Sequence, residues 1–560
     1  MKPTVSAFLM VMLVSGFLYA NSSPDAWGPE KVLIHEYKFP AQADSWVLKT
    51  AETELWGAIY APKVLIGPHP VLIFIHGAHG TCGRGNNPRV DDNDEYVLKG
   101  TCPQGYVPVP SHLGFGYMAE RLASWGYIVV SVNLNRGLMF FASTPDDPQD
   151  KHMIRARSKM VMRHLELLKQ WNDKGQGDLD GQNVLPWDLK GKIDFSQVGL
   201  LGLSIGGTTV RQVSQFIAGE LEWPGSFPIQ LKGAVELGGT DTKEPTVSDI
   251  PNTPWLSIVG MCDASVSPYF SAQPYIRAFD TVATKPSAPR AMYEIMGAVH
   301  AFFNTEWQVT EALTCIGHEP LWKGQVASPI QQELTRLAVM SFFRAYVGAS
   351  IHKEFATLFD PLYPLPRNIG SGDRIRRAFL PSTEGRADIL EVVKGNESIV
   401  AKGVDSDVFD LYLNMNSRTL CEPCTPWMVR TINWSPASEN YFQVNFGNQS
   451  DVRDISDENY LQFSVNPTNN TLTPLPLNLS IYLVDSRGKL SRPVNLKDHA
   501  TIRELVGNFR AIQPLPQTVR IPLKDFGLST DLKHIRGVRW AFDSTTYGGI
   551  YLNEVFFSER

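Results

Sequence analysis

A serine between glycines is the residue of this chain best suited to chemistry. Ser204 lies in the run GLSIGG at 202–207, directly after the apolar stretch 198–201. A serine in this G-x-S-x-G pattern is typical of a sharp turn from a strand into a helix, and the glycines avoid collisions with neighbouring backbone. We therefore predict that Ser204 is a nucleophile. A glycine–serine turn without chemistry is the alternative.

A serine hydroxyl is a poor nucleophile at neutral pH. It needs a histidine that takes its proton as a general base, and a carboxylate that orients the histidine. His300 follows the last predicted strand of the first part of the chain and is the candidate base; an ordinary loop histidine is the alternative. Asp263 follows the preceding predicted strand and is the favoured acid. Asp241, one strand earlier, is its rival.

The negative oxygen of a tetrahedral intermediate needs backbone N–H donors. Ile205, next after the nucleophile, supplies one donor in this interpretation, and Ala78, in the loop after a predicted strand, supplies the second. His76 and His79 have the H-x-x-H spacing of metal ligands, but no third ligand is evident, so no metal is predicted. Aromatic residues that could line an acyl pocket or pack in the core are Phe115, Phe140, Phe141, Phe302, Phe303 and Trp307.

The elements that position these residues follow from the periodicity of apolar residues. Short apolar runs predict buried strands at 71–75, 127–132, 193–201, 231–237, 255–259 and 291–296, and paired strands are expected within 32–61. Amphipathic spacing predicts helices at 117–125, 155–171, 208–217 and 330–346. Their alternation predicts a mostly parallel sheet with helices on both faces, and ligands of such sheets bind at the carboxyl ends of the strands.

The pattern changes in the last third of the chain. Prolines and glycines between 361 and 372 indicate a linker, which we place at 351–384. Beyond it, short alternating runs predict strands without long helices at 460–465, 479–485, 518–523, 538–542 and 550–557. We therefore predict two domains, 30–350 with the catalytic residues and 385–560 as an antiparallel β-sandwich.

The N-terminus and the cysteines indicate export. Residues 1–20 read as a signal peptide, with Lys2 before an apolar core that is too short to span a bilayer. Six cysteines in an exported chain suggest three disulfides. The pairs suggested by position are Cys82 with Cys102, Cys262 with Cys315, and Cys421 with Cys424. A net charge of −6 provides no broad cationic surface, so a nucleic-acid partner is not expected.

Four sequence blocks, in this order, support a family resemblance: HGAHGTC at 76–82, GLSIGG at 202–207, CDASVS at 262–267 and GAVHAFFNTEW at 297–307. With them, residues 30–350 resemble secreted α/β-hydrolases of the dienelactone hydrolase and platelet-activating-factor acetylhydrolase-like group, which includes polyester hydrolases. The resemblance implies an α/β-hydrolase fold and ester hydrolysis through an acyl-enzyme on Ser204, Asp263 and His300, without a cofactor. Leu203 departs from the histidine of many relatives, which bears on substrate preference.

The second part resembles a carbohydrate-binding-type jelly roll, on the segments LPQTVRIPLKDFG at 515–527 and YGGIYLNEVFFS at 547–558. The expected function is therefore that of a secreted serine hydrolase acting on small or polymeric carboxylic esters. One alternative is a carbohydrate esterase that the C-terminal part brings to a polysaccharide. Another is a catalytically silent binding or adhesion protein on a hydrolase scaffold.

Overall fold

The computed structural model of the chain describes most of its residues. They are 23–84, 100–139, 147, 150–175, 185–241, 252–282, 288–307, 312–324, 326–348, 350–365, 374–382, 384, 386–390, 398–411, 427–447, 451–469, 473–508, 511–512, 514–527 and 529–559. The predicted signal peptide at 1–20 and the cysteines at 421 and 424 lie outside the described residues.

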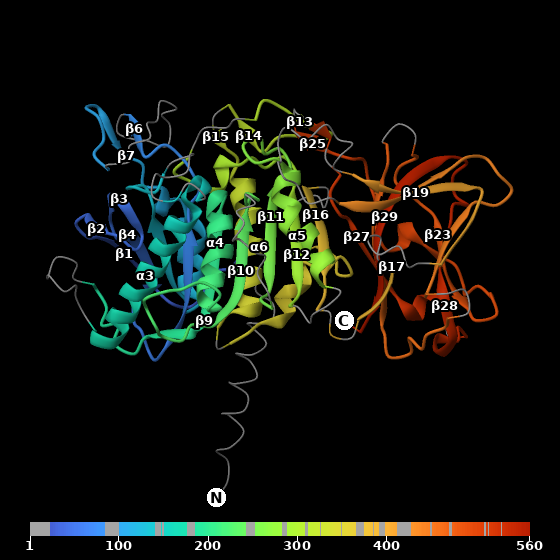
Figure 1. Ribbon diagram of the computed structural model, residues 1–560, viewed down its shortest axis with the longest axis horizontal. Helices are drawn as coiled ribbons and strands as arrows, with labels where there is room; N and C mark the ends of the chain where they lie inside the picture. Colours follow the sequence, from blue (N-terminus) through green and yellow to red (C-terminus); the bar gives the residue numbers. More distant parts are fainter. Residues whose placement is uncertain are drawn as a thin grey trace, which may run out of the picture.

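A sheet of nine strands dominates the first part of the described chain (Figure 1). In spatial order the strands are β1 (Val32–Lys38), β4 (Trp56–Pro62), β8 (Ile128–Asn133), β5 (His69–Ile75), β9 (Ile193–Leu203), β10 (Leu231–Leu237), β11 (Trp255–Gly260), β12 (Arg290–Ile295) and β16 (Ile375–Leu380). The central strands β8, β5, β9, β10, β11 and β12 run parallel to one another. The outer strands β1, β4 and β16 pair in antiparallel fashion. Because parallel strands end at the same edge, Ser204, Asp263 and His300 all follow strands at one edge of this sheet.

Two apolar cores lie against this sheet, because successive side chains of a strand point in opposite directions. Leu72 and Phe74 of β5 belong to the core that α2 and α6 complete. Val71 and Ile73 belong to the core that α3 and α4 complete. The described α-helices are α2 (Gly116–Ser124), α3 (Ile154–Lys174), α4 (Ile205–Ile217), α5 (Pro268–Val282) and α6 (Pro329–Tyr346).

The C-terminal region consists of two antiparallel sheets around a shared apolar core. One sheet has the order β19 (Val404–Asp410), β20 (Met428–Trp434), β29 (Gly548–Ser558), β22 (Tyr460–Pro467) and β27 (Thr518–Pro522), with β17 (Arg386–Leu390) also on β29. The other has the order β18 (Ser398–Lys402), β21 (Tyr441–Asn445), β28 (Ile535–Ala541), β23 (Ser480–Asp485) and β24 (Val494–Asn495). Short strands elsewhere are β2 (Gln42–Asp44), β3 (Leu48–Thr53), β6 (Cys82–Arg84), β7 (Tyr106–Pro108), β13 (Cys315–Ile316), β14 (Trp322–Lys323), β15 (Val326–Ala327), β25 (Gly507–Asn508) and β26 (Ala511–Ile512).

The C-terminal region packs directly on the end of the main sheet. Val259 of β11 and Met292 of β12 lie in one apolar core with Trp427 and Phe556 of the C-terminal region. Polar contacts continue the interface, since the Gln462 side chain donates a hydrogen bond of 2.6 Å to a main-chain carbonyl of β16. The two regions therefore share buried surface.

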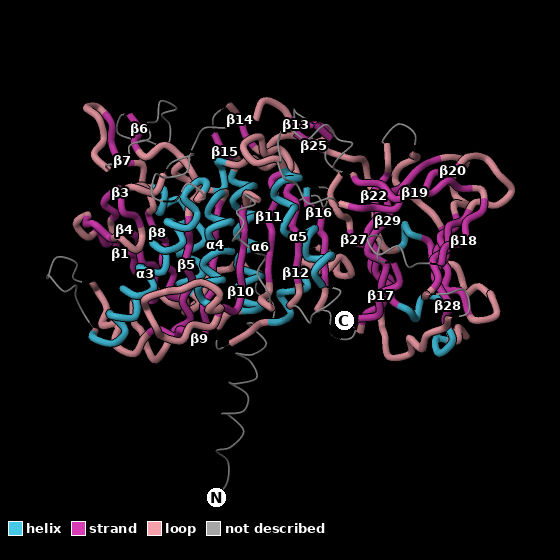
Figure 2. Tube along the Cα trace, in the orientation of Figure 1, coloured by secondary structure: helices cyan, strands magenta, loops and turns pink. Residues whose placement is uncertain are grey.

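The predicted fold class, an α/β-hydrolase fold followed by a jelly-roll-like β-sandwich, is wrong. Strand residues outnumber helical residues in the described chain, and the helices are few (Figure 2). The large sheet is mixed, with antiparallel strands at both of its edges. Edge strands such as β1 and β16 are partly exposed and carry polar residues, so their sequences lack the apolar runs that mark buried strands.

Individual elements agree better with the sequence than the class does. The helix predicted at 330–346 is α6, and the strand predicted at 231–237 is β10. The pattern did not predict α5, which contains Pro274, or β16, which falls inside the predicted linker. No described helix combines the length and apolar character needed to span a bilayer.

Candidate active site

Ser204 occupies the sharp turn between β9 and α4. Its backbone has φ 59° and ψ −126°, a conformation that is strained for a residue with a side chain. A Cβ atom on Gly202 would lie 2.1 Å from the carbonyl oxygen of Gly206, and one on Gly206 would lie 2.5 Å from the carbonyl oxygen of Ile75. Both positions therefore require glycine, and the turn has the form that the sequence predicts.

Backbone hydrogen bonds tie this turn to the end of β10. The Ser204 N–H donates to the carbonyl oxygen of Leu237 at 3.0 Å, and the Ser204 carbonyl accepts from the N–H of Thr240 at 3.1 Å. These bonds fix the main chain on both sides of the hydroxyl. The rotation of the Ser204 side chain then remains the main freedom of the candidate nucleophile.

His300 and Asp263 form a buried pair. Nδ1 of His300 lies 2.7 Å from Oδ2 of Asp263, and the two residues are 7% and 1% exposed. The other carboxylate oxygen of Asp263 accepts the N–H groups of Ser265 at 3.0 Å and Val266 at 2.8 Å. Since a carboxylate only accepts, Nδ1 of His300 donates to it, and Nε2 is the nitrogen able to accept a proton.

Residues 237–238, at the end of β10, lie next to both the His300–Asp263 pair and the serine. A Cβ atom on Gly238 would lie 3.0 Å from Nδ1 of His300 and 3.1 Å from Oδ2 of Asp263. The preceding carbonyl, that of Leu237, accepts the Ser204 N–H. Leu237 is thus hydrogen-bonded to Ser204, and the next residue, Gly238, lies beside His300 and Asp263.

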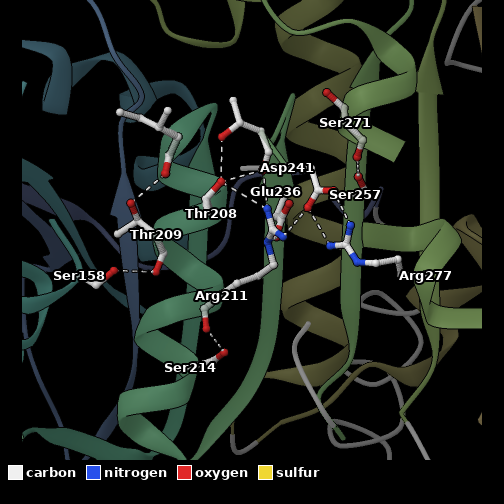
Figure 3. A network of polar contacts seen from close by, with 12 residues as sticks. Ser158, Thr208, Thr209, Arg211, Ser214, Glu236, Asp241, Ser257, Ser271 and Arg277 are labelled. Atoms are coloured by element: carbon white, nitrogen blue, oxygen red, sulfur yellow. Dashed lines mark hydrogen bonds and ion pairs between the residues drawn. The ribbon is translucent and has the colours of Figure 1, made fainter. Parts of the chain in front are cut away.

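Asp241, the rival acid, is bound to other partners. Its carboxylate contacts the guanidinium groups of Arg211, at 3.0 Å, and Arg277, as drawn in Figure 3. Burial would raise the pKa of Asp241, but the two guanidinium groups overcome it and hold this pKa below its usual value. The same network includes Glu236, whose carboxylate lies 3.0 Å from Nε of Arg211. Asp241 therefore links α4 to α5 by charge.

The predicted oxyanion donors lie on either side of the serine. Ile205 is the first residue of α4, where an N–H has no partner within the helix and the helix dipole favours negative charge. Ala78 is partly buried in the loop after β5. A Cβ atom on Gly77 would lie 2.5 Å from Cβ of Ser204, so this loop approaches the serine as closely as glycine permits.

His76 and Arg157, whose role the sequence did not suggest, hold the Ala78 loop. Nε2 of His76 accepts the N–H of Leu134 at 2.8 Å, and Nδ1 donates to the carbonyl of Gly77 at 2.8 Å. Burial, with the nearby Arg157, lowers the pKa of His76 well below its usual value, so the ring is neutral. Arg157 is fully buried and donates to the His76 carbonyl.

The H-x-x-H metal interpretation has no support in this geometry. Both ring nitrogens of His76 are used by the main chain, and the ring of His79 stacks on Trp307 with centroids 4.8 Å apart. Cys262, Cys315 and His318 lie close enough together to share an ion, but both sulfurs are bonded to each other. Thiolate ligands are therefore absent from that cluster of described residues.

The aromatic residues proposed for an acyl pocket serve as core. Phe115, Phe303 and Trp307 belong to the core completed by α2 and α6, and Phe302 lies in a smaller apolar cluster beside Cys262. All four are at most 1% exposed. Phe140 and Phe141 lie outside the described residues.

Two of the three suggested disulfides are present in the described part of the chain, and the third, between Cys421 and Cys424, lies outside it. Cys82 is bonded to Cys102, and Cys262 is bonded to Cys315. The second bond anchors the residue before Asp263. Two disulfides are compatible with an extracellular location.

No model of a known protein family matches this chain, and no curated protein matches it.

Proposed function

We propose that the protein is a secreted serine hydrolase that cleaves carboxylic esters. The observation that carries the proposal is the buried His300–Asp263 pair beside a serine on a strained strand-to-helix turn. These are the three groups that nucleophilic acyl transfer requires, in the chain order serine, acid, histidine.

In the proposed reaction, the Ser204 oxygen attacks the ester carbonyl while Nε2 of His300 takes the hydroxyl proton. Asp263 stabilises the imidazolium that forms, and the N–H groups of Ala78 and Ile205 stabilise the oxyanion. His300 then protonates the departing alcohol, which leaves an acyl group on Ser204. Water activated by His300 attacks this acyl-enzyme, releases the acid and restores the serine.

A fluorophosphonate probe tests the nucleophile directly, because it modifies activated serines. We expect labelling at Ser204 that disappears in Ser204→Ala. Ser214→Ala is the matched control, since Ser214 lies on α4, the helix that follows Ser204, is also buried and donates to the carbonyl of Arg211. Absence of labelling in the folded wild-type protein would favour the alternative of a silent binding protein.

A panel of p-nitrophenyl esters and amides tests the reaction class. We expect turnover of short acyl esters, and its loss in His300→Ala with an unchanged circular dichroism spectrum. Turnover of amides in preference to esters would contradict the proposed substrate class.

A carbohydrate esterase is the second candidate function. The C-terminal region has a pocket of about 570 Å³, whose lining includes Tyr482, Asn440 and Asp543. These residues offer an aromatic ring and polar groups, which are the kinds of group that bind sugars. Retention of the full-length chain on insoluble glycans, and its loss in Tyr482→Ala, would support this candidate. Lack of retention of the wild-type chain would remove it.

A further inference from the structure

A short segment of the C-terminal region reaches the acid loop of the candidate site. β25 pairs in antiparallel fashion with β13, and the two strands are labelled side by side in Figures 1 and 2. The register places Asn508 opposite Cys315, whose sulfur is bonded to that of Cys262. Because Cys262 immediately precedes Asp263, β25 is connected to the acid through one strand pair and one covalent bond.

Asn508 also contacts the acid directly. Its side-chain Nδ2 donates a hydrogen bond of 2.6 Å to the main-chain carbonyl oxygen of Asp263, and the residue is fully buried. A buried carbonyl that loses its donor carries the whole cost of its desolvation. This hydrogen bond therefore favours one position of the Asp263 main chain over others.

In the described chain, the other hydrogen bonds of this loop involve atoms other than the main-chain carbonyl oxygen of Asp263. The Asp263 N–H donates to the carbonyl of Gly260 at 3.1 Å, and the Cys262 N–H donates to the carbonyl of Ala298 at 2.9 Å, which joins the acid loop to the loop that carries His300. The carboxylate itself is held by two N–H groups and the imidazole. The hydrogen bond from Asn508 holds the main-chain carbonyl oxygen of Asp263.

The segment that carries Asn508 is itself firmly packed. Val506 lies in the apolar core that the main sheet and the C-terminal region share, together with Met261 of the acid loop. A Cβ atom on Gly317 would lie 3.2 Å from Cγ1 of Val506, so β13 and the segment are in close contact. Asn508 thus follows a residue that is packed into this core.

We propose that Asn508 is a positioning residue for Asp263, and that the C-terminal region is through it a part of the catalytic unit, whatever else that region binds. The inference rests on the proposed serine-hydrolase function. Asn508 keeps the Asp263 main chain in place, and the carboxylate then remains aligned with Nδ1 of His300.

Substitution in the full-length chain tests this role. In Asn508→Leu we expect kcat for a p-nitrophenyl ester to fall about tenfold with KM nearly unchanged, as loss of one buried hydrogen bond predicts. The acidic limb of the kcat/KM profile should move to lower pH, because a misaligned carboxylate stabilises the imidazolium of His300 less. Asn508→Ala, which places no new atoms against the Asp263 oxygen, should give the same result if the leucine variant does not fold.

Asn466→Leu is the matched control. Asn466 is also a buried asparagine of the C-terminal region, and it donates a 2.8 Å hydrogen bond to the carbonyl of Leu515 instead of Asp263. We expect it to lower the free energy of unfolding without moving the acidic limb. A shift of the limb in Asn466→Leu equal to that in Asn508→Leu would overturn the proposal, because it would reveal a general effect of destabilisation.

A spectroscopic measurement separates this inference from the proposed function. The strongly downfield proton resonance of Nδ1–H in the His300–Asp263 hydrogen bond does not require turnover. We expect it in the wild type and in Asn466→Leu, and its loss or shift in the Asn508 variants. If the wild type neither labels nor hydrolyses esters, the proposed function fails, while this resonance still decides the positioning role; an unchanged resonance in both Asn508 variants would overturn it.

Discussion

Two aspartates follow neighbouring strands of the main sheet and differ in the groups that bind them. Asp241 comes after β10 and Asp263 after β11, and they are only 4% and 1% exposed. Asp241 contacts two guanidinium groups, those of Arg211 and Arg277, whereas Asp263 accepts from the imidazole of His300 and from two backbone N–H groups. Position on the sheet is thus shared, and the neighbouring charges differ.

The difference assigns separate tasks to the two carboxylates. The charge of Asp241 is already balanced by cations that cannot lose their protons, so this aspartate joins α4 to α5 (Figure 3). The partner of Asp263 is an imidazole, which exchanges a proton with Ser204 in the proposed reaction. In the proposed reaction Asp263 stabilises an imidazolium, whereas Asp241 stabilises the fold through its ion pairs.

Asp263→Asn should produce the largest change of activity. An amide cannot stabilise the imidazolium and favours the wrong tautomer of His300, so we expect kcat for ester hydrolysis to fall by about 10³–10⁴-fold. The measurement is the rate with a p-nitrophenyl ester, with circular dichroism as the control for folding. A decrease of less than tenfold would mean that another group orients His300.

The same substitution at the other aspartate, Asp241→Asn, should act on stability instead. Removing the charge of Asp241 takes a carboxylate away from both guanidinium groups and leaves Arg211 paired with Glu236, at a cost of about 3–5 kcal/mol. Urea unfolding measures this loss, and kcat of the folded variant should stay within about threefold of the wild type, an energy difference below 1 kcal/mol. A stable Asp241→Asn protein with strongly reduced kcat would reverse the assignment of the two residues.

Removing the disulfide next to Asp263 should change the position of Asp263 and leave Asp241 in place. In Cys262→Ser with Cys315→Ser, we expect the free energy of unfolding to fall by about 2–4 kcal/mol and kcat to fall about tenfold, because the acid loop loses its covalent anchor. The control is the pair Cys82→Ser and Cys102→Ser, which removes the other disulfide and leaves the acid loop intact. Equal losses of kcat in both pairs would show that the anchor has no special effect on Asp263.

The sequence predicts local features of this molecule well, for physical reasons. The turn at Ser204 was predictable because the need for glycine at 202 and 206 is steric and lies within a few residues. Buried strands such as β5 were predictable because both of their faces are apolar over residues 71–75. Each of these signals is complete within one short stretch of the chain.

Features that depend on distant partners were not predictable. The choice between Asp263 and Asp241 remained open because Arg211 and Arg277, which bind Asp241, lie on helices whose packing the sequence pattern does not specify. The contact of Asn508 with Asp263 joins residues that are 245 positions apart. The fold class was wrong for the same reason: the pairing of β16 with β12 and the core shared by the two regions are long-range, and edge strands carry a weak apolar signal.

Glu294 is another buried carboxylate of the main sheet. It lies on β12 opposite Arg376 of β16 and is 1% exposed. Burial raises the pKa of Glu294 to about 7, and Arg376 offsets this only in part. The pKa of Asp241, in contact with two guanidinium groups, moves in the opposite direction. The number and closeness of cations, at similar burial, therefore decide the direction of the shift.

This difference predicts a pH-dependent effect of Glu294→Gln on stability. The pKa of Glu294 rises on folding from 4.5 to about 7, so the folded protein binds the proton more tightly, and stability falls as the pH rises through this window. Glutamine stays neutral at every pH. The variant should thus nearly match the wild type at pH 5 and exceed it at pH 8 by about 2–3 kcal/mol in urea unfolding. A variant that is less stable than the wild type at pH 8 would show that the attraction between Glu294 and Arg376 outweighs the cost of burial. Glu294 would then resemble Asp241, whose charged form is stabilised by neighbouring guanidinium groups.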